Sequence, residues 1–259
     1  MKVNYLKALL AVTTAILLTS APAFASGTDQ SIEASAKNSY VFKTYLKDDT
    51  IKARSMDGVV TLTGAVSEES HKSLAQETVA NLPGVKRVDN QLELKGDRPA
   101  ENSDGWIGMK AKSSLLFNRN VSGLDTQVLV TDGIVTLRGE AENQAQKDLA
   151  GEYAKDIQGV KEVKNEITIA SLSGERQKQE MGEKIDDASI TAQVKTQLLN
   201  RRSTSGYKIG VKTNDGVVTL SGKADNAKGK AMTTKAAEDV NGVMKVINNM
   251  TITESLSKN

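Results

Sequence analysis

The stretch Asp57-Gly58-Val59-Val60-Thr61-Leu62-Thr63-Gly64 decides the fold, because closely similar stretches occur at two further places in the chain. These are Asp132-Gly133-Ile134-Val135-Thr136-Leu137-Arg138-Gly139 and Asp215-Gly216-Val217-Val218-Thr219-Leu220-Ser221-Gly222. After each closing glycine, a Gly-Val pair and then an asparagine follow at identical spacings, at Gly84 and Asn90, Gly159 and Asn165, and Gly242 and Asn248. This repetition predicts three copies of one small module.

Each copy is predicted to run helix, strand, strand, helix, strand. The Asp-Gly pair favours a tight hairpin turn, because glycine accepts a positive φ. Apolar side chains alternate along the strand that follows, as in Val60 and Leu62, and a helix-period apolar stripe ends at the next glycine. The expected fold class is α+β, with three tandem αββαβ modules that each pack two helices on one face of a three-stranded sheet.

The first helix is clearest in the second and third copies. Apolar residues recur there at i, i+4 and i+8, and an aspartate precedes each series where an N-cap is expected: Ile107, Ala111 and Leu115 after Asp104, and Ile190, Val194 and Leu198 after Asp187. In the first copy Lys37, Val41 and Tyr45 align with these positions. This alignment makes the first copy five residues shorter before its first strand, so we expect it to be the least stable copy.

The domain boundaries follow from the repeats and from the polar segments between them. We expect a signal peptide at 1–25 and modules at 31–95, 104–170 and 186–254. The segments 95–103 and 171–184 carry no apolar stripe and are therefore predicted to be linkers between separately folding modules.

The N-terminus has the pattern of a secretory signal. Lys2 and Lys7 precede an apolar run at 8–18, and small residues at 21–25 predict cleavage after Ala25. The run is too short to span a bilayer comfortably, which favours cleavage over an uncleaved N-terminal helix. The chain has no Cys, so neither disulfides nor acylation on cysteine is available. The expected location is the periplasm, as a soluble protein.

Charge and motifs exclude several classes of function. Without the two signal-peptide lysines, 32 basic residues balance 32 acidic ones, and a neutral chain is a poor nucleic-acid binder. No catalytic or nucleotide-binding motif is present, so we expect no enzymatic activity, no small-molecule substrate, no cofactor and no metal. The single histidine, His71, aligns with Gln146 and Gly229 and is therefore predicted to be a solvent-exposed surface residue.

Two recurring residue types admit a functional interpretation that we judge weaker than a structural one. The strand-end glycines Gly64, Gly139 and Gly222 have no basic anchor nearby, so we assign them to strand exits rather than to phosphate loops. Asn90, Asn165 and Asn248 are expected to be half-buried, with hydrogen bonds to the hairpin backbone rather than to a ligand.

The only tryptophan, Trp106, is the one residue that points to a binding surface. It lies on the first turn of a predicted helix with Ile107, Met109, Lys110 and Lys112. Tryptophan beside lysine suits a membrane interface, where the indole lies at headgroup level and ammonium groups meet lipid phosphates. The alternative is that Trp106 covers the edge of its own module's core.

The repeat resembles the BON module (bacterial OsmY and nodulation). The resemblance rests on the Asp-Gly hairpin motif, on the Gly-Val-x-x-Val-x-Asn strand, and on the first-helix segments 106–112 and 189–195. It implies an αββαβ fold, a cell-envelope location and attachment to phospholipid surfaces, and it implies no catalytic residues.

Two functions remain open from the sequence. One is a periplasmic stress protein, of the osmotically inducible kind, whose modules bind phospholipid membrane surfaces. The other is a protein-interaction or chaperone-like envelope factor that uses its modules for docking to envelope proteins.

Overall fold

The computed structural model describes residues 27–97, 99–121, 126–170, 184–204 and 208–253. The predicted signal peptide and most of the second predicted linker lie outside these residues. Module 1 comprises α1 (Gly27–Asn38), α2 (Tyr40–Thr44), β1 (Thr50–Met56), β2 (Val59–Val66), α3 (Glu69–Ala80) and β3 (Arg87–Leu94). Module 2 comprises α4 (Asp104–Leu116), β4 (Gln127–Thr131), β5 (Ile134–Arg138), β6 (Glu140–Ala141), α5 (Gln144–Lys155), β7 (Glu162–Asn165) and β8 (Thr168–Ile169). Module 3 comprises α6 (Asp187–Asn200), β9 (Ile209–Asn214), β10 (Val217–Ala224), α7 (Ala227–Glu238), β11 (Lys245–Asn248) and β12 (Thr251–Ile252).

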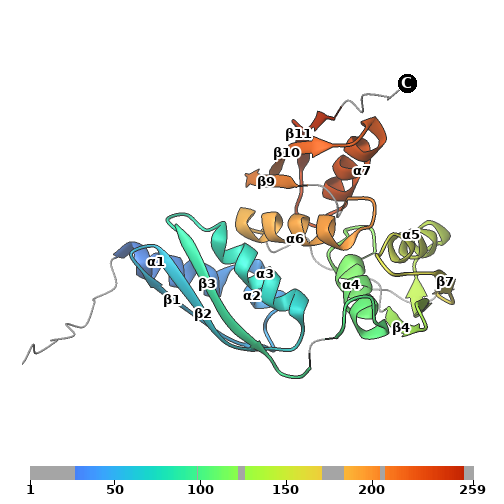
Figure 1. The fold of residues 1–259 in the computed structure, drawn as a ribbon, viewed down its shortest axis with the longest axis horizontal. Helices are drawn as coiled ribbons and strands as arrows, with labels where there is room; N and C mark the ends of the chain where they lie inside the picture. The colour runs from blue at the N-terminus through green and yellow to red at the C-terminus, as the bar shows by residue number, and fades with distance from the viewer. Residues whose placement is uncertain (1–26, 98, 122–125, 171–183, 205–207, 254–259) are drawn as a thin grey trace, which may run out of the picture.

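All three modules share one sheet topology, which confirms the predicted fold class (Figure 1). The first two strands form an antiparallel hairpin, and the second helix then crosses over to a third strand parallel to the second. In modules 2 and 3 the third strand consists of two short pieces, β7 with β8 and β11 with β12. The middle strand of each sheet is the most buried, because helices cover one face and strands flank both edges.

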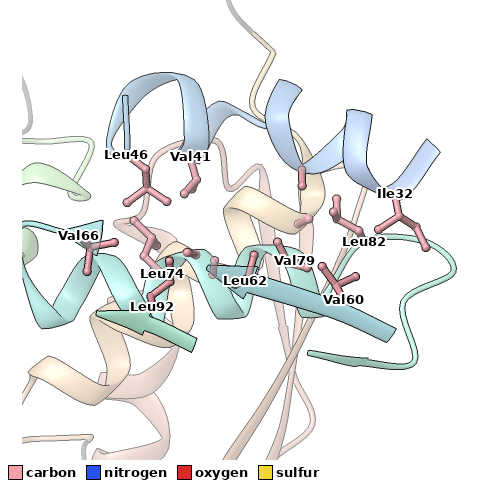
Figure 2. Packing of buried hydrophobic residues seen from close by; sticks show 14 of the residues in the cluster. Ile32, Val41, Leu46, Val60, Leu62, Val66, Leu74, Val79, Leu82 and Leu92 are labelled. Carbon is pink, nitrogen blue, oxygen red and sulfur yellow. The ribbon is translucent and has the colours of Figure 1, made fainter. Parts of the chain in front are cut away.

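Module 1 shows how the core of one module is built. Figure 2 shows Ile32 and Val41, from α1 and α2, facing Leu62 on β2 and Leu74 on α3. All of these side chains are buried, and the remaining core residues are aliphatic apart from Phe117. A small core of interlocking Val, Leu, Ile and Ala is what the scarcity of aromatic residues predicts.

The aspartates expected to cap the first helices have a different role. Ser103 and Asp186 are the N-caps of α4 and α6, so the assignment of Asp104 and Asp187 as N-caps was wrong by one residue. The Asp104 carboxylate instead accepts the backbone N–H groups of Asp132 (2.8 Å) and Gly133 (2.9 Å). Both hairpin residues have positive φ, and their amides would otherwise lack a protein partner. Asp187 binds the third hairpin in the same way.

The same contact corrects the alignment of the first copy. Asp29 of α1 accepts the amides of Asp57 and Gly58, at 3.0 Å each, so Asp29 is the equivalent of Asp104. Ile32 then replaces Lys37 as the leading apolar residue, and it packs near Gly84 as Ile107 does near Gly159. The first copy therefore has the same spacing as the others. It differs instead in its first helix, which is interrupted at Ser39 between α1 and α2.

The three asparagines have the structural role that was predicted, with a different partner. Each Nδ2 donates to a backbone carbonyl of the module's second helix, and each Oδ1 accepts the amide two residues later in the chain. The pairs are Asn90 with Lys72 O (3.1 Å) and Leu92 N (3.1 Å), Asn165 with Lys147 O (2.7 Å) and Ile167 N (3.3 Å), and Asn248 with Lys230 O (3.1 Å) and Met250 N (2.9 Å). The asparagines thus join the third strand to the helix and not to the hairpin.

The glycines assigned to strand exits are structural, but Gly64 and Gly222 lie within β2 and β10 and not at strand ends. Gly64 has φ +117°, and a Cβ on it would lie 1.8 Å from the carbonyl oxygen of Thr50 on the paired strand. Gly222 is placed in the same way, with a Cβ position 2.3 Å from the carbonyl oxygen of Lys208. A side chain at either position would collide with backbone, which accounts for the glycines without a ligand.

Helix α6 lies at the centre of the molecule, in contact with all three modules (Figure 1). One face, with Ile190, Val194 and Leu198, belongs to the core of module 3. A second face, with Ala188 and Ala192, completes the core of module 1. Eleven of the helix's residues are buried. The polar linkers predict separately folded modules, and this shared helix shows that the modules are packed together.

Polar contacts attach modules 1 and 2 to α6. Tyr40 N donates to Asp186 Oδ2 (2.8 Å), and Lys195 Nζ lies 2.7 Å from Glu77 Oε2 on α3. On the side of module 2, Gln197 Nε2 donates to the carbonyl oxygen of Ser114 on α4 (3.2 Å). The faces of α6 toward modules 1 and 2 carry mainly alanine and polar residues, so the sequence shows an apolar stripe only on the face toward module 3.

Modules 2 and 3 also exchange backbone contacts in a reciprocal way. The segment after α4 forms a β-bridge with the end of α7, at Asn118 and Val240, and Arg119 N donates to Asp239 O (2.8 Å). The segment after α6 forms the equivalent bridge with the end of α5, at Ile157 and Arg201, and Arg202 N donates to the carbonyl of Asp156. The two modules are therefore related by an approximate two-fold axis.

Candidate functional site

The predicted membrane-contact residues lie on different faces of α4: Trp106 and Lys110 form one group, Met109 and Lys112 form another, and Ile107 is buried. Trp106 and Lys110 lie one turn apart, and Lys110 Nζ is 3.9 Å from the centroid of the indole ring. Trp106 is half-buried and packs against the core of module 2. The ring therefore covers the core edge on one side, and a lysine ammonium group lies over its face.

The ammonium group of Lys110 is itself partly withdrawn from water. Burial lowers the pKa of Lys110, and the negative charge of Glu101 acts in the opposite direction. A partly desolvated cation stacked on an aromatic ring has fewer water contacts to lose when an anionic group approaches.

Ile107 is not available to a membrane, which corrects its place among the contact residues. Its side chain is 1% exposed, within the core of module 2 and close to Gly159. It is the equivalent of Ile32 and Ile190, which are buried in the same way. Ile107 is a core residue, and the three-fold repeat of this position already contained the signal.

Met109 and Lys112 face a different feature, a groove between modules 1 and 2 with a volume of about 380 Å³. One wall is formed by α4 and β4, and the other by residues 67–69 at the start of α3, by the end of β3 and by the segment that joins the modules. We call this the α4–β4 groove; it is lined by Ser67, Glu68, Glu69, Leu94, Gly96, Asp97, Pro99, Asp104, Gly105, Gly108, Met109, Lys112, Val128, Leu129 and Val130.

Sequence reasoning missed Leu129, which is 48% exposed on β4 and lines this groove. The sheet registers give the signal that could have found it. Leu129 pairs with Thr136, as Arg54 pairs with Thr61 and Lys212 with Thr219. The second module thus carries an apolar residue where the other two carry a cation.

His71 was predicted to be a solvent-exposed surface residue, but its side chain is only partly exposed and contacts Asp49. The His71 Nδ1 atom lies 2.6 Å from Asp49 Oδ2, and the Asp49 side chain is only 1% exposed. Asp49 also accepts the backbone N–H of Ser67 (2.8 Å). Burial raises the pKa of Asp49, but hydrogen bonds from His71 and Ser67 outweigh burial and hold that pKa below its usual value. The pair ties the loop before β1 to the start of α3.

Metal binding finds no support in the described part of the chain. Within residues 27–97, 99–121, 126–170, 184–204 and 208–253, no three His, Cys, Asp or Glu side chains gather as a metal site would require. Over the same residues, no helix has the length and apolarity needed to cross a bilayer.

Comparison with known proteins identifies the repeat. The BON domain matches residues 28–96, 103–171 and 186–254, which together cover most of the chain. The chain belongs to the BON-domain family. It is 29% identical over 191 residues to osmotically-inducible protein Y of Escherichia coli, which covers 74% of this chain and 92% of that protein. It is 28% identical over 138 residues to the outer membrane lipoprotein DolP of Haemophilus influenzae, which covers 52% of this chain and 71% of the relative.

A solved structure of CdsD, a structural protein of the type III secretion system of Chlamydia trachomatis, also aligns with the chain. It covers 82% of this BON protein and 90% of the CdsD chain, at 17% identity and a TM-score of 0.24. So low a TM-score carries no argument about arrangement or function. The family assignment rests on the three BON matches.

Proposed function

We propose that this BON protein is a non-enzymatic factor of the bacterial periplasm whose modules bind phospholipid membrane surfaces. The observation that carries the proposal is the Trp106–Lys110 pair on α4, with the exposed Lys112 two residues further on. An indole and lysine ammonium groups on one short segment suit the headgroup region of a bilayer. Relatives described as osmotically inducible and as an outer membrane lipoprotein support an envelope role under osmotic stress.

The size of the expected contact is modest. Each lysine near an anionic surface contributes about 1 kcal/mol, and the attraction is screened over about 8–10 Å at physiological ionic strength. Binding should therefore need anionic lipid and should weaken as salt is added. Partial burial of Trp106 limits how much of the ring can enter the interface, so charge should contribute more than insertion.

The experiment is vesicle binding by the full mature chain. Phosphatidylcholine vesicles with and without phosphatidylglycerol are sedimented with the protein, and the fluorescence of Trp106 is recorded. Changing both Lys110 and Lys112 to Gln should lower affinity about tenfold or more. Lys164→Gln, at an exposed position on β7, is the matched control and should change little. Absence of sedimentation together with an unchanged tryptophan spectrum would refute membrane binding.

Export to the periplasm is tested separately. The predicted signal at 1–25 lies outside the described residues, and cleavage after Ala25 predicts Ser26 as the mature N-terminus. Mass spectrometry of the protein from a periplasmic fraction measures this directly. An intact Met1 in that fraction would contradict the prediction.

The second candidate function is docking of envelope proteins, in the manner of an interaction or chaperone-like factor. The specific observation in its favour is the apolar edge of module 2 at Leu129, beside the α4–β4 groove. Trp106 and Lys110 do not line the groove, whereas Leu129 does, so the two functions can be tested independently with these residues; Lys112 is common to both surfaces.

A further inference from the structure

Strand β4 is an edge strand, because the order of its sheet is β4-β5-β7. Its two-residue hairpin loop, Asp132-Gly133, has positive φ at both positions, so Thr131 and Ile134 form the hydrogen-bonded pair next to the loop. Hydrogen-bonded and non-bonded pairs alternate along an antiparallel ladder. The N–H and C=O groups of Val128 and Val130 therefore point away from β5, toward the outer edge.

In module 1 one outward amide of the equivalent edge is covered. Ser55 of β1 occupies the register position of Val130, since it pairs with Val60 as Val130 pairs with Val135. The Ser55 N–H donates to the side chain of Glu33 on α1 (2.9 Å). A helix residue thus occupies the outward amide of this edge strand.

In module 2 the helix residue that corresponds to Glu33 is a glycine. Glu33 lies one residue after Ile32, and Gly108 lies one residue after the equivalent Ile107. Gly108 lines the α4–β4 groove, and a Cβ on it would be 3.4 Å from a methyl group of Val130. Among the described residues, no hydrogen bond to the outward amides of Val128 and Val130 is formed.

The side chains of β4 also lack the usual protection of an edge strand. Natural edge strands commonly carry lysine or another charge that prevents pairing with a further chain. β1 carries Lys52 and Arg54 and β9 carries Lys212, whereas the sequence of β4 is uncharged and Leu129 is exposed. The open amides and the apolar side chain coincide on the same strand.

The charge of the groove indicates what kind of chain fits it. Among the lining residues that the structure describes, the acidic side chains of Glu68, Glu69 and Asp97 outnumber the cation Lys112, and Asp104 accepts the hairpin amides. This balance disfavours anionic lipid and favours a segment with basic residues. We propose that the β4 edge binds an extended segment of another polypeptide, with apolar and basic side chains, as an added strand in the α4–β4 groove.

The test uses the full chain and a fluorescein-labelled peptide of about eight residues in which valine and lysine alternate. Fluorescence anisotropy should show saturable binding. The same peptide with a fully N-methylated backbone should not bind, because it cannot donate to the strand edge. A peptide with glutamate in place of lysine should bind more weakly, because the groove is acidic. Failure of the lysine peptide to bind, or equal binding of the N-methylated peptide, would overturn the proposal.

Three variants place the site on β4. Gly108→Glu recreates the covering side chain of module 1 and should weaken binding about tenfold or more, as should Leu129→Lys, which copies Lys212. Both substitutions copy residues that the other modules carry at the same place. Gly108→Ala is the control and should bind like the unchanged protein. Full affinity in Gly108→Glu and Leu129→Lys, with circular dichroism unchanged, would locate the peptide elsewhere. Trp106 and Lys110 do not line the groove, so failure of vesicle binding leaves this result unaffected.

Discussion

Arg119 of module 2 and Arg202 of module 3 occupy equivalent positions, and each donates to the carbonyls at the end of the other module's second helix. Arg119 Nη2 donates to Val240 O (2.8 Å) and also to the carbonyl of Val243. Arg202 Nη2 donates to the carbonyl oxygens of Lys155 (2.8 Å), Ile157 and Val160. The ends of α7 and α5 leave carbonyls without helical partners, and a cation there also complements the helix dipole.

Removing either guanidinium should loosen the pair of modules. We expect Arg119→Ala to lower the free energy of unfolding by about 1.5–3 kcal/mol, the usual worth of hydrogen bonds to a charged group. Urea denaturation followed by circular dichroism measures this. Arg138→Ala is the control: its ion pair with Glu166 is half-exposed on both sides and should contribute about 0–1 kcal/mol. Equal losses in the two variants would contradict a capping role.

Neutralising the aspartate that holds a hairpin should destabilise that module. Asp104→Asn keeps the shape but turns a bidentate charged acceptor into an amide with one acceptor oxygen, and the expected loss is about 1–3 kcal/mol. Asp132→Asn in the same hairpin is the matched control, because asparagine tolerates the positive φ of 54°. Urea midpoints of the two variants give the comparison. A larger loss for Asp132→Asn would place the important carboxylate in the loop.

Stability should depend on the ionisation of Asp49. Its pKa in the folded chain is lowered, so its carboxylate stabilises the fold above the unfolded value of about 3.9, and this is lost as the pH falls through the lower folded value. The difference in unfolding free energy between the protein and Asp49→Asn should therefore shrink as the pH is lowered from about 5 to 3. Asp225→Asn, at an exposed position, should show no such trend. A difference that is constant with pH would contradict the role of the pair.

Module 3 should depend on its neighbours. A fragment of residues 186–254 would expose the Ala188–Ala192 face of α6 and lose the backbone contacts with Arg119 and Asp156. We expect it to unfold at lower urea concentration than residues 104–254, and that fragment at lower concentration than the full mature chain. Identical midpoints for module 3 in all three would show that the modules are independent.

The repeat and the hairpins could be predicted from the sequence. The Asp-Gly turn and the alternating strand residues are local signals, and their spacing is the same in all three copies. Apolar periodicity alone left the start of module 1 ambiguous, because the series Ile32, Ala36 and Tyr40 competes with the series that includes Val41 and Tyr45. The identical separation of Asp29, Asp104 and Asp187 from their hairpin glycines contained the correct alignment. That signal is polar and long-range, so a search for apolar stripes does not find it.

For the candidate site too, the sequence points to individual residues but does not show the contacts between modules. Trp106, Lys110 and Lys112 stand out by residue type, whereas the α4–β4 groove depends on how module 1 is placed against module 2. The burial of α6 was equally hidden, because its alanines and glutamines have the composition of an ordinary exposed face. The role of a residue at a contact between modules depends on the module that packs against it and not on its neighbours in the sequence.

The reciprocal bridges between modules 2 and 3 limit how the chain can grow. When two equivalent surfaces bind each other, the contact is self-complementary and closes after two members. Many repeat proteins stack each unit on the next and extend without limit into a solenoid. Here the remaining module, module 1, attaches to a different face of α6. Duplication of the BON module has therefore produced a closed pair with one further module attached, and a fourth copy could not join by repeating the contact between modules 2 and 3.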